Sequence, residues 1–144
     1  MVHVLGFTLW LGGGIATMVA GVSAKGFAAA ERLAAYKLIG AIQRMLVGPG
    51  AMAVLLSGLV LAMPYMKQGA VPGWMGLMMI AGILGALGAV TISVPTAAKL
   101  ARLELDARGG LPEAFQMLRK RQIFAATIAG GFGLIAMFAV TLGT

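Results

Sequence analysis

The 144-residue sequence has no cysteine and a single histidine, and charged residues make up only 10% of it. Without cysteine the chain forms no disulfide, offers no thiolate to a metal ion and carries out no thiol redox chemistry. A soluble chain of this length would carry about 25% charged residues. The low charge, together with a hydrophobic fraction of 60%, excludes an ordinary soluble domain.

Acidic residues are especially scarce, and all of them lie between apolar blocks: Glu31, Glu104, Asp106 and Glu113. The apolar blocks themselves contain no carboxylate, whereas proton-coupled transporters and pumps use intramembrane Asp or Glu. Hydrolytic and nucleophilic catalysis are also disfavoured, because the lone histidine has neither a carboxylate partner nor a thiol. The serines are expected mid-membrane or nearer the cytoplasm, away from the histidine: Ser23, Ser57 and Ser93. An enzyme is therefore not the preferred interpretation.

Long apolar runs are what the sequence does contain, at residues 2–24, 45–66, 74–98 and 123–143. Each reaches the roughly 20 residues that a helix needs to cross about 30 Å of hydrocarbon. The first run has no basic residue before it and is too long for a typical signal peptide, which indicates a retained helix. We predict an all-α fold: a single transmembrane domain, residues 1–144, that forms a four-helix bundle in the lipid bilayer.

Basic residues are distributed unevenly over the connections between these runs. The two long connections hold ten of the eleven Lys and Arg residues, whereas the short middle connection holds only Lys67. The positive-inside rule then places both long connections in the cytoplasm. We expect a multi-pass protein of a cell membrane, of the bacterial inner-membrane type, with both termini on the non-cytoplasmic side. The net charge of +7 thus reflects topology, and a nucleic-acid partner is not expected.

The second, third and fourth helices are expected to extend beyond the bilayer into the cytoplasm. The second helix should begin near Ala28, because the residues that follow are strong helix formers. The third should continue past Lys99 towards Asp106. Pro49 lacks an N–H group and has a glycine on either side, which predicts a kink in the second helix.

Small residues recur at every fourth position in three of the predicted helices, and residues at that spacing share one helix face. Such stripes let helices approach closely in lipid. They predict a compact bundle and can also support a homodimer. The stripes are Gly12, Ala16, Ala20 and Ala24; Ala81, Gly85, Ala89, Ser93 and Ala97; and Ala125, Ala129 and Gly133.

The histidine lies on a helix face with three other notable residues. Steps of three and four lead from His3 to Gly6, Trp10 and Gly13, nearly along one line. Glycines beside a histidine leave a flat hollow, in which a planar macrocycle can reach an axial imidazole nitrogen. The alternative is that His3 is a polar residue at the outer water interface and that the glycines serve only helix packing. The residues alone leave both interpretations open.

Methionine is unusually abundant, with eleven residues. In the predicted topology six lie near the outer helix ends: Met1, Met63, Met66, Met75, Met78 and Met79. Thioether and imidazole ligands suit the soft ion Cu(I), which suggests a copper site. Its ligands would be His3, Met75, Met78 and Met79. Methionine is equally a common apolar gap-filler, and the neighbouring Tyr65 and Trp74 are typical of a membrane interface.

The stretch HVLGFTLWLGG, residues 3–13, resembles the first helix of two related membrane families. These are the HemJ-type protoporphyrinogen oxidases, which are four-helix haem proteins, and the membrane domain of the copper-resistance D family. PGAMAVLLSG at 49–58 and PGW at 72–74 are similar to the second and third HemJ-type helices. The resemblance implies that His3 is an axial haem ligand and that Trp10, Gly13 and Pro49 are fold markers.

The chain departs from the HemJ-type pattern in its last two helices. Met78 stands where that pattern has a lysine, the third helix lacks the expected histidine, and RQIF replaces an Asn-Glu pair at the fourth helix. These departures suggest that the oxidase chemistry is missing. The leading hypothesis is a non-catalytic protein that binds haem b through His3 for electron transfer, sensing or delivery.

Two alternatives remain beside the haem hypothesis. The first is Cu(I) handling through His3 and the outer methionines. The second is a structural subunit or assembly factor of a larger membrane complex, which would use small residues such as Gly85 to associate with a partner.

Overall fold

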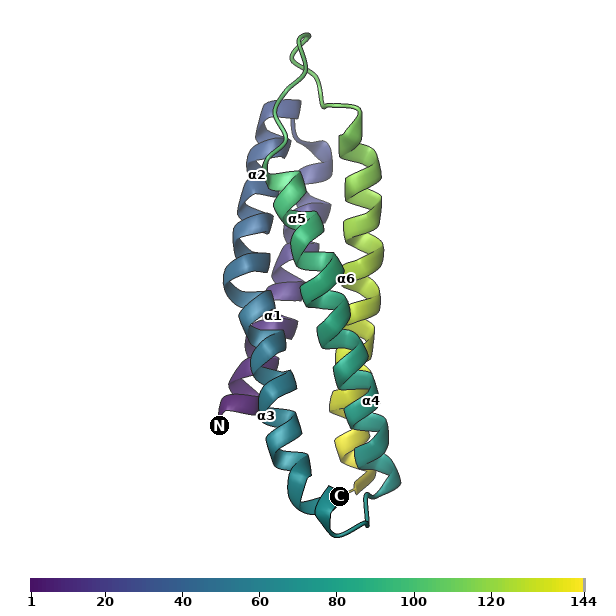
Figure 1. Ribbon diagram of the computed structural model, residues 1–144. Helices are drawn as coiled ribbons and strands as arrows, with labels where there is room; N and C mark the ends of the chain where they lie inside the picture. Colours follow the sequence, from purple (N-terminus) through teal and green to yellow (C-terminus); the bar gives the residue numbers. More distant parts are fainter. Residues whose placement is uncertain (144) are drawn as a thin grey trace.

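The computed structural model describes residues 1–143, and within that range it contains helices and no β-strand. Four helical spans are long and apolar enough to cross a membrane: Val2–Gly26, Ala29–Lys67, Gly73–Ala101 and Ala114–Gly143. Figure 1 shows them side by side as an elongated bundle. The predicted all-α four-helix membrane fold is confirmed.

Each span is made of two or three helical elements in continuous succession. The first consists of α1 (Val2–Ser23) and the short 3-10 turn η1 (Ala24–Gly26). The second consists of α2 (Ala29–Ile42), the π-helical η2 (Gln43–Val47) and α3 (Gly48–Lys67). The third consists of α4 (Gly73–Gly88), the π-helical η3 (Ala89–Ser93) and α5 (Val94–Ala101). The fourth consists of α6 (Ala114–Ala139) and η4 (Val140–Gly143).

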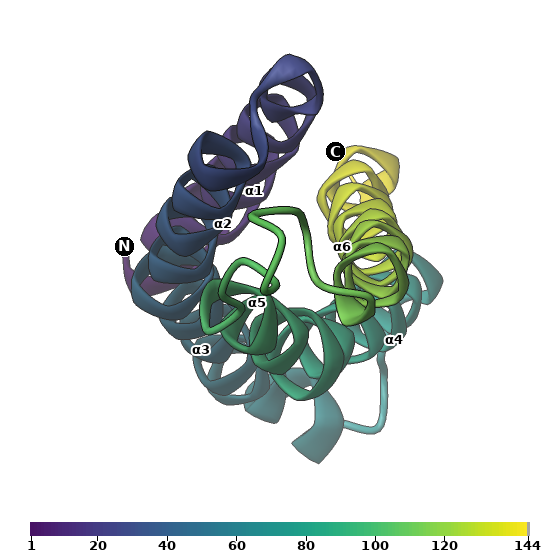
Figure 2. The same cartoon turned by 90° about the horizontal axis from the view of Figure 1, so that it is seen from above.

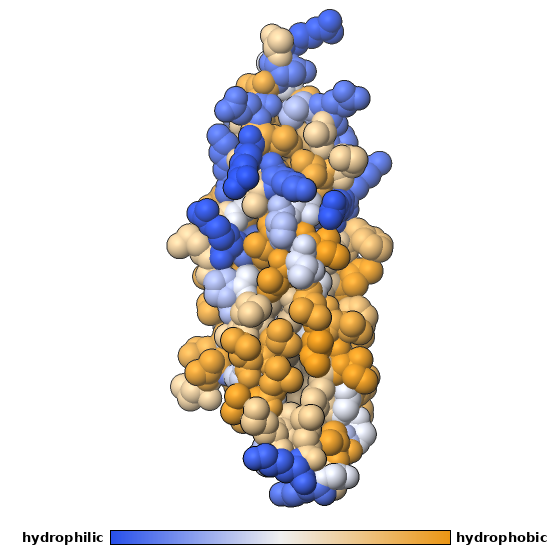
Figure 3. Space-filling model, in the orientation of Figure 1, coloured by the Kyte–Doolittle hydropathy of each residue, from blue (hydrophilic) through white to orange (hydrophobic). Residues whose placement is uncertain are grey.

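The principal helix pairs are α1 with α3, α4 with α6, and α2 with α5, and Figure 2 shows how they surround the bundle axis. The two long connections lie at one end of the bundle, at the top of Figure 1, and both termini lie in its lower half. Hydrophilic side chains gather at that upper end, above a broad apolar belt (Figure 3). We call this end, with the connections around residues 25–28 and 102–113, the basic end, and the opposite one the terminal end.

Two π-helical turns interrupt the second and third spans, and each ends two residues before a proline. In η2 the Gly48 N–H donates to Gln43 O, and in η3 the Val94 N–H donates to Ala89 O. Pro49 and Pro95 follow directly. A proline has no N–H to continue the ordinary helical ladder, and a π turn is one way of accommodating that loss. The kink predicted at Pro49 stays a prediction, and the π turns that precede Pro49 and Pro95 were not predicted.

The helix ends agree with the sequence at one position and disagree at another. The second span begins at Ala29, next to the expected Ala28, whereas the third span ends at Ala101. The prediction that it continues towards Asp106 was wrong. The Asp106 carboxylate accepts hydrogen bonds from the backbone N–H groups of Arg108 and Gly110, at 2.9 and 2.8 Å. This side chain thus stabilises a turn of the connection instead of another turn of helix.

Glycines allow the backbones of α1 and α3 to touch. A Cβ atom at Gly50 would lie 2.6 Å from Trp10 N and 2.8 Å from Gly6 O, and one at Gly6 would lie 2.9 Å from Gly50 O. Gly13 faces a side chain of η2 instead, with 2.8 Å between a Cβ atom and Val47 Cγ2. Because backbone atoms cannot move aside as flexible side chains do, this helix pair depends on the absence of side chains at Gly6 and Gly50.

Only some of the predicted small-residue stripes face the bundle interior. The stripes of the third and fourth spans are buried throughout, at Ala81, Gly85, Ala89, Ser93 and Ala97 and at Ala125, Ala129 and Gly133. On α1, by contrast, Gly12 and Ala16 are exposed. The face of α1 that packs in the bundle is the one that carries Gly6, Trp10 and Gly13.

Replacement of Gly50 by alanine tests the contact between α1 and α3. We expect Gly50→Ala to lower the free energy of unfolding by about 1–3 kcal/mol, since the added methyl overpacks backbone atoms. Gly12→Ala is the matched control: no atom lies within 4 Å of a Cβ there, and stability should stay unchanged or rise by up to about 1 kcal/mol. Thermal unfolding in detergent micelles measures both. Equal stability of the two variants would contradict the contact.

Candidate functional site

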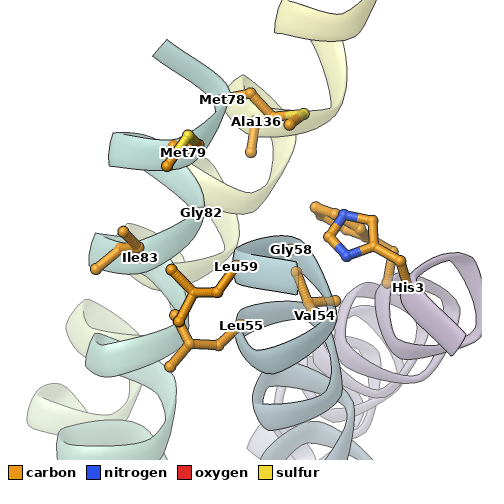
Figure 4. A pocket seen from close by; sticks show the side chains of 11 residues that line it. His3, Val54, Leu55, Gly58, Leu59, Met78, Met79, Gly82, Ile83 and Ala136 are labelled. Atoms are coloured by element: carbon orange, nitrogen blue, oxygen red, sulfur yellow. The ribbon is translucent and has the colours of Figure 1, made fainter. Parts of the chain in front are cut away.

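His3 lies on the first turn of α1 and its ring points between the helices, not outward into lipid (Figure 4). It is half-buried and lines a pocket between α1, α3, α4 and α6 at the terminal end. The other lining residues are Phe7, Val54, Leu55, Gly58, Leu59, Met78, Met79, Gly82, Ile83 and Ala136. Apart from the imidazole and two thioethers, the pocket is lined by hydrocarbon side chains and glycine.

Ser57, on α3, determines which nitrogen of His3 is free. His3 Nδ1 lies 2.9 Å from Ser57 Oγ, and the Ser57 hydroxyl donates its proton to the carbonyl oxygen of Ala53. Since Ser57 has only one proton to donate, its oxygen accepts a hydrogen bond from His3 Nδ1–H. The proton then stays on Nδ1, and Nε2 carries an unprotonated lone pair. The expectation that Ser57 lies away from His3 was wrong.

Two neighbours fix the orientation of the imidazole plane. Gly58 lies against the ring, since a Cβ atom at Gly58 would be only 3.1 Å from His3 Cε1. Phe7, one turn further along α1, meets the ring edge-on, with 5.3 Å between ring centroids and an interplanar angle of 75°. Together with the Ser57 hydrogen bond, these contacts hold the ring in a single position.

Of the methionines predicted as metal ligands, two line the His3 pocket and one does not. Met78 and Met79 project from α4 on the side of the pocket opposite His3 (Figure 4). Met75 is buried elsewhere, with 6% of its surface exposed. The structure therefore brings together His3, Met78 and Met79 and leaves Met75 out.

The other residues on the His3 face of α1 are used in helix packing. The space beside Gly6 and Gly13, which the sequence suggested as a hollow for a macrocycle, is filled by Gly50, Val54 and Val47. Trp10 is 2% exposed and lies in the core, where its ring occupies the room that Gly85 and Gly133 leave. Gly85 thus faces the interior of the same chain. Even a Cβ atom at Gly85 would lie only 2.8 Å from Trp10 Cη2, so a larger side chain would clash with the Trp10 ring.

The volume of the His3 pocket limits what it can hold. It measures about 40 Å³, whereas pockets that enclose ligands of drug or cofactor size measure roughly 300–1,000 Å³. One water molecule needs about 10–15 Å³ of the same kind of volume. The pocket therefore has room for a single ion or a few small atoms beside His3 Nε2, and a larger planar ligand would require the helices to move apart.

A second polar feature, which the sequence analysis missed, crosses the bundle closer to the basic end. Gln122 Nε2 donates to Ser93 Oγ at 3.0 Å, Ser93 Oγ donates to Gln43 Oε1 at 3.2 Å, and Gln43 Nε2 donates to Thr17 Oγ1 at 3.1 Å. Thr17 Oγ1 in turn donates to Gly14 O at 2.9 Å. All four side chains are buried, and each of the four spans contributes one of them.

Both π turns contribute a member to this polar chain, because Gln43 is the first residue of η2 and Ser93 the last of η3. One atom of the chain is unsatisfied: Gln122 Oε1 is buried and has no hydrogen-bond partner. The signal was present in the sequence as two glutamines near apolar runs and a serine and a threonine within them. Spacing along a single helix did not show that the four residues meet.

Two substitutions of similar shape test this polar chain. Gln43→Leu leaves Ser93 without its acceptor, and we expect the free energy of unfolding to fall by about 1–3 kcal/mol. Gln122→Leu removes an oxygen that already lacks a partner, while Ser93 keeps its bond to Gln43, and it should cost less. Thermal unfolding of both variants in the same detergent measures the difference. A Gln122 variant as unstable as the Gln43 variant would contradict this ordering.

Comparison with protein-family models, with curated proteins and with solved structures gave no match for this chain. The resemblance to the HemJ-type and copper-resistance D families therefore stays a hypothesis that depends on the motifs quoted above. Its principal residue, His3, lies in a pocket with a free Nε2, whereas Trp10 and Gly13 are packed against other helices.

Proposed function

We propose that this integral membrane protein binds Cu(I) at the terminal end of its bundle, through His3 Nε2 and the thioethers of Met78 and Met79. The observation that carries the proposal is the hydrogen bond from His3 Nδ1 to Ser57 Oγ. Metal-bound histidines almost always donate their second ring N–H to an acceptor, which fixes the tautomer and ring orientation. Here that acceptor is in place, and the other nitrogen faces the pocket.

The donor set and the pocket size both favour Cu(I). Thioether and imidazole groups are soft or intermediate ligands, and they select Cu(I) over hard cations such as Mg²⁺ or Ca²⁺. Methionine side chains are flexible enough to move towards a bound ion. A pocket of about 40 Å³ accommodates such an ion, which would be the cargo of the protein in copper uptake, delivery or sensing.

A haem-like tetrapyrrole, which the HemJ resemblance implies, is the competing ligand for His3 Nε2. The same bare nitrogen suits an axial haem ligand. Packing of Gly6 against α3 and of Gly13 against η2 leaves no hollow for a macrocycle on that face, so haem would have to separate α1 from the second span. Titration with haem b therefore distinguishes the two ligands.

Removal of the imidazole or of its hydrogen-bond acceptor tests the copper proposal. We expect His3→Ala to abolish Cu(I) binding, and Ser57→Ala to weaken it by about 10–100-fold, as loss of an outer-shell partner does. Thr8→Ala is the control, since its exposed hydroxyl bonds only the Val4 carbonyl on the same helix. The measurement is competition with a chromophoric Cu(I) chelator, using purified protein in micelles under anaerobic, reducing conditions.

The methionine ligands are tested by the double variant Met78→Leu, Met79→Leu, because leucine conserves most of the volume without the sulfur. Its control is Met45→Leu, Met117→Leu, at two exposed positions remote from the pocket. Only the first pair should weaken Cu(I) binding. Equal Cu(I) affinity in wild type and His3→Ala overturns the proposal. If haem titration gives a Soret band with wild type but not with His3→Ala, haem and not Cu(I) is the ligand of His3.

A further inference from the structure

A groove on the outer surface, separate from the His3 pocket, lies between the third and fourth spans. It follows the middle of the third span, at residues 84–92, and the half of the fourth span nearer the basic end, at residues 121–129. It has a volume of about 310 Å³ and runs along α4 and η3 on one side and α6 on the other, which lie side by side in Figure 1. Its lining residues are Leu84, Gly88, Ile92, Arg121, Phe124, Ala125, Ile128 and Ala129. All of them except Arg121 are apolar.

Small residues make the floor of this groove, and large ones make its walls. Ala125 and Ala129 are buried, and a Cβ atom at Gly88 would only reach ordinary contact distance, 3.8 Å from Ala129 Cβ. The walls stand out on both sides at exposed residues: Leu84, Ile92, Phe124 and Ile128. The groove is therefore open along its length to the surrounding hydrocarbon.

The length of the groove matches one acyl chain within one leaflet. Residues 84–92 and 121–129 each span eight helical steps, which is about 12 Å at 1.5 Å per residue. Half of a bilayer's hydrocarbon core is about 15 Å thick. A fatty acyl chain laid along the groove would thus be covered by protein over most of its depth in that leaflet.

Arg121 gives the groove a polar and a positive end. It belongs to a run of three basic residues, Arg119 to Arg121, at the membrane-facing side of the basic end. Arg121 is exposed, and within residues 1–143 it makes neither an ion pair nor a side-chain hydrogen bond. An arginine at this depth extends its guanidinium towards the head-group region, where it forms bidentate hydrogen bonds with phosphate groups.

We infer that this groove is a binding site for an anionic phospholipid of the leaflet at the basic end. One acyl chain would lie on Gly88, Ala125 and Ala129, and the head-group phosphate would contact Arg121. The choice of an anionic phospholipid follows from charge complementarity. The apolar groove fits an acyl chain, and the unpaired Arg121 at its end fits an anionic head group. The groove shares no lining residue with the His3 pocket, so lipid binding and copper binding can be measured separately.

Lipid retention measured by native mass spectrometry tests this inference. Delipidated wild type in micelles is titrated with phosphatidylglycerol or with phosphatidylcholine of the same acyl chains. We expect wild type to retain phosphatidylglycerol more strongly, and Arg121→Gln to lower that retention by about fivefold, the effect of one basic residue near the surface. Arg108→Gln is the control, because Arg108 is exposed in the connection before α6.

The apolar part of the groove is tested by Ala125→Leu, which fills its floor and should weaken binding of both lipids. Ala16→Leu, on the exposed face of α1, is the matched control and should bind both as wild type does. Equal retention in Arg121→Gln and Arg108→Gln overturns the inference, and these exposed positions put no folding at risk. A wild-type dimer that Ala125→Leu dissociates would overturn it too, with a second copy of the chain as the occupant.

Discussion

The contact between the backbones of α1 and α3 determines the geometry of the terminal end. Gly6 and Gly50 bring the two helices together until main-chain atoms meet. About one turn from Gly6 along α1 and two turns from Gly50 along α3, His3 comes opposite Ser57 and Gly58. A residue with a side chain at either glycine would separate the helices and lengthen the hydrogen bond that fixes the imidazole. The same crossing places Trp10 in the space next to Gly85 and Gly133. Helix packing and the chemistry of His3 therefore depend on the same few atoms.

The number, length and approximate ends of the helices could be predicted from the sequence, because lipid demands about 20 apolar residues for each crossing. Which face of each helix points inward could be predicted only in part. In water a buried face is apolar and an exposed one polar, whereas in lipid both faces are apolar and small size is the remaining signal. On α1 this signal was ambiguous: Gly12 and Ala16 of one stripe are exposed, whereas Gly6 and Gly13 pack against α3 and η2.

Contacts between residues far apart in the sequence could not be predicted, for a different reason. Ser57 is 54 residues from His3, and their hydrogen bond follows from helix pairing, which the spacing of residues within one helix does not determine. The polar chain from Gln122 to Thr17 joins four spans in the same way. The third span has the same arrangement as the second: a π turn that ends two residues before a proline, Pro95 or Pro49. In both places the π turn shifts the helical register next to a buried polar side chain, Gln43 or Ser93, and so couples a backbone irregularity to a contact between helices.

Within residues 1–143, the polar groups of the bundle interior include no anionic side chain, and this limits which metal ions can bind there. The buried chain uses amides and hydroxyls, and the His3 pocket adds an imidazole and two thioethers, all of which can be neutral. The four carboxylate residues, Glu31, Glu104, Asp106 and Glu113, are all exposed. A hard divalent cation would need several anionic oxygen ligands to offset the loss of its hydration shell, and the interior offers none within the described residues. A soft monovalent ion needs fewer ligands and accepts neutral nitrogen and sulfur. The lack of anionic side chains in the interior is thus the property on which the proposal of Cu(I) over a hard cation depends.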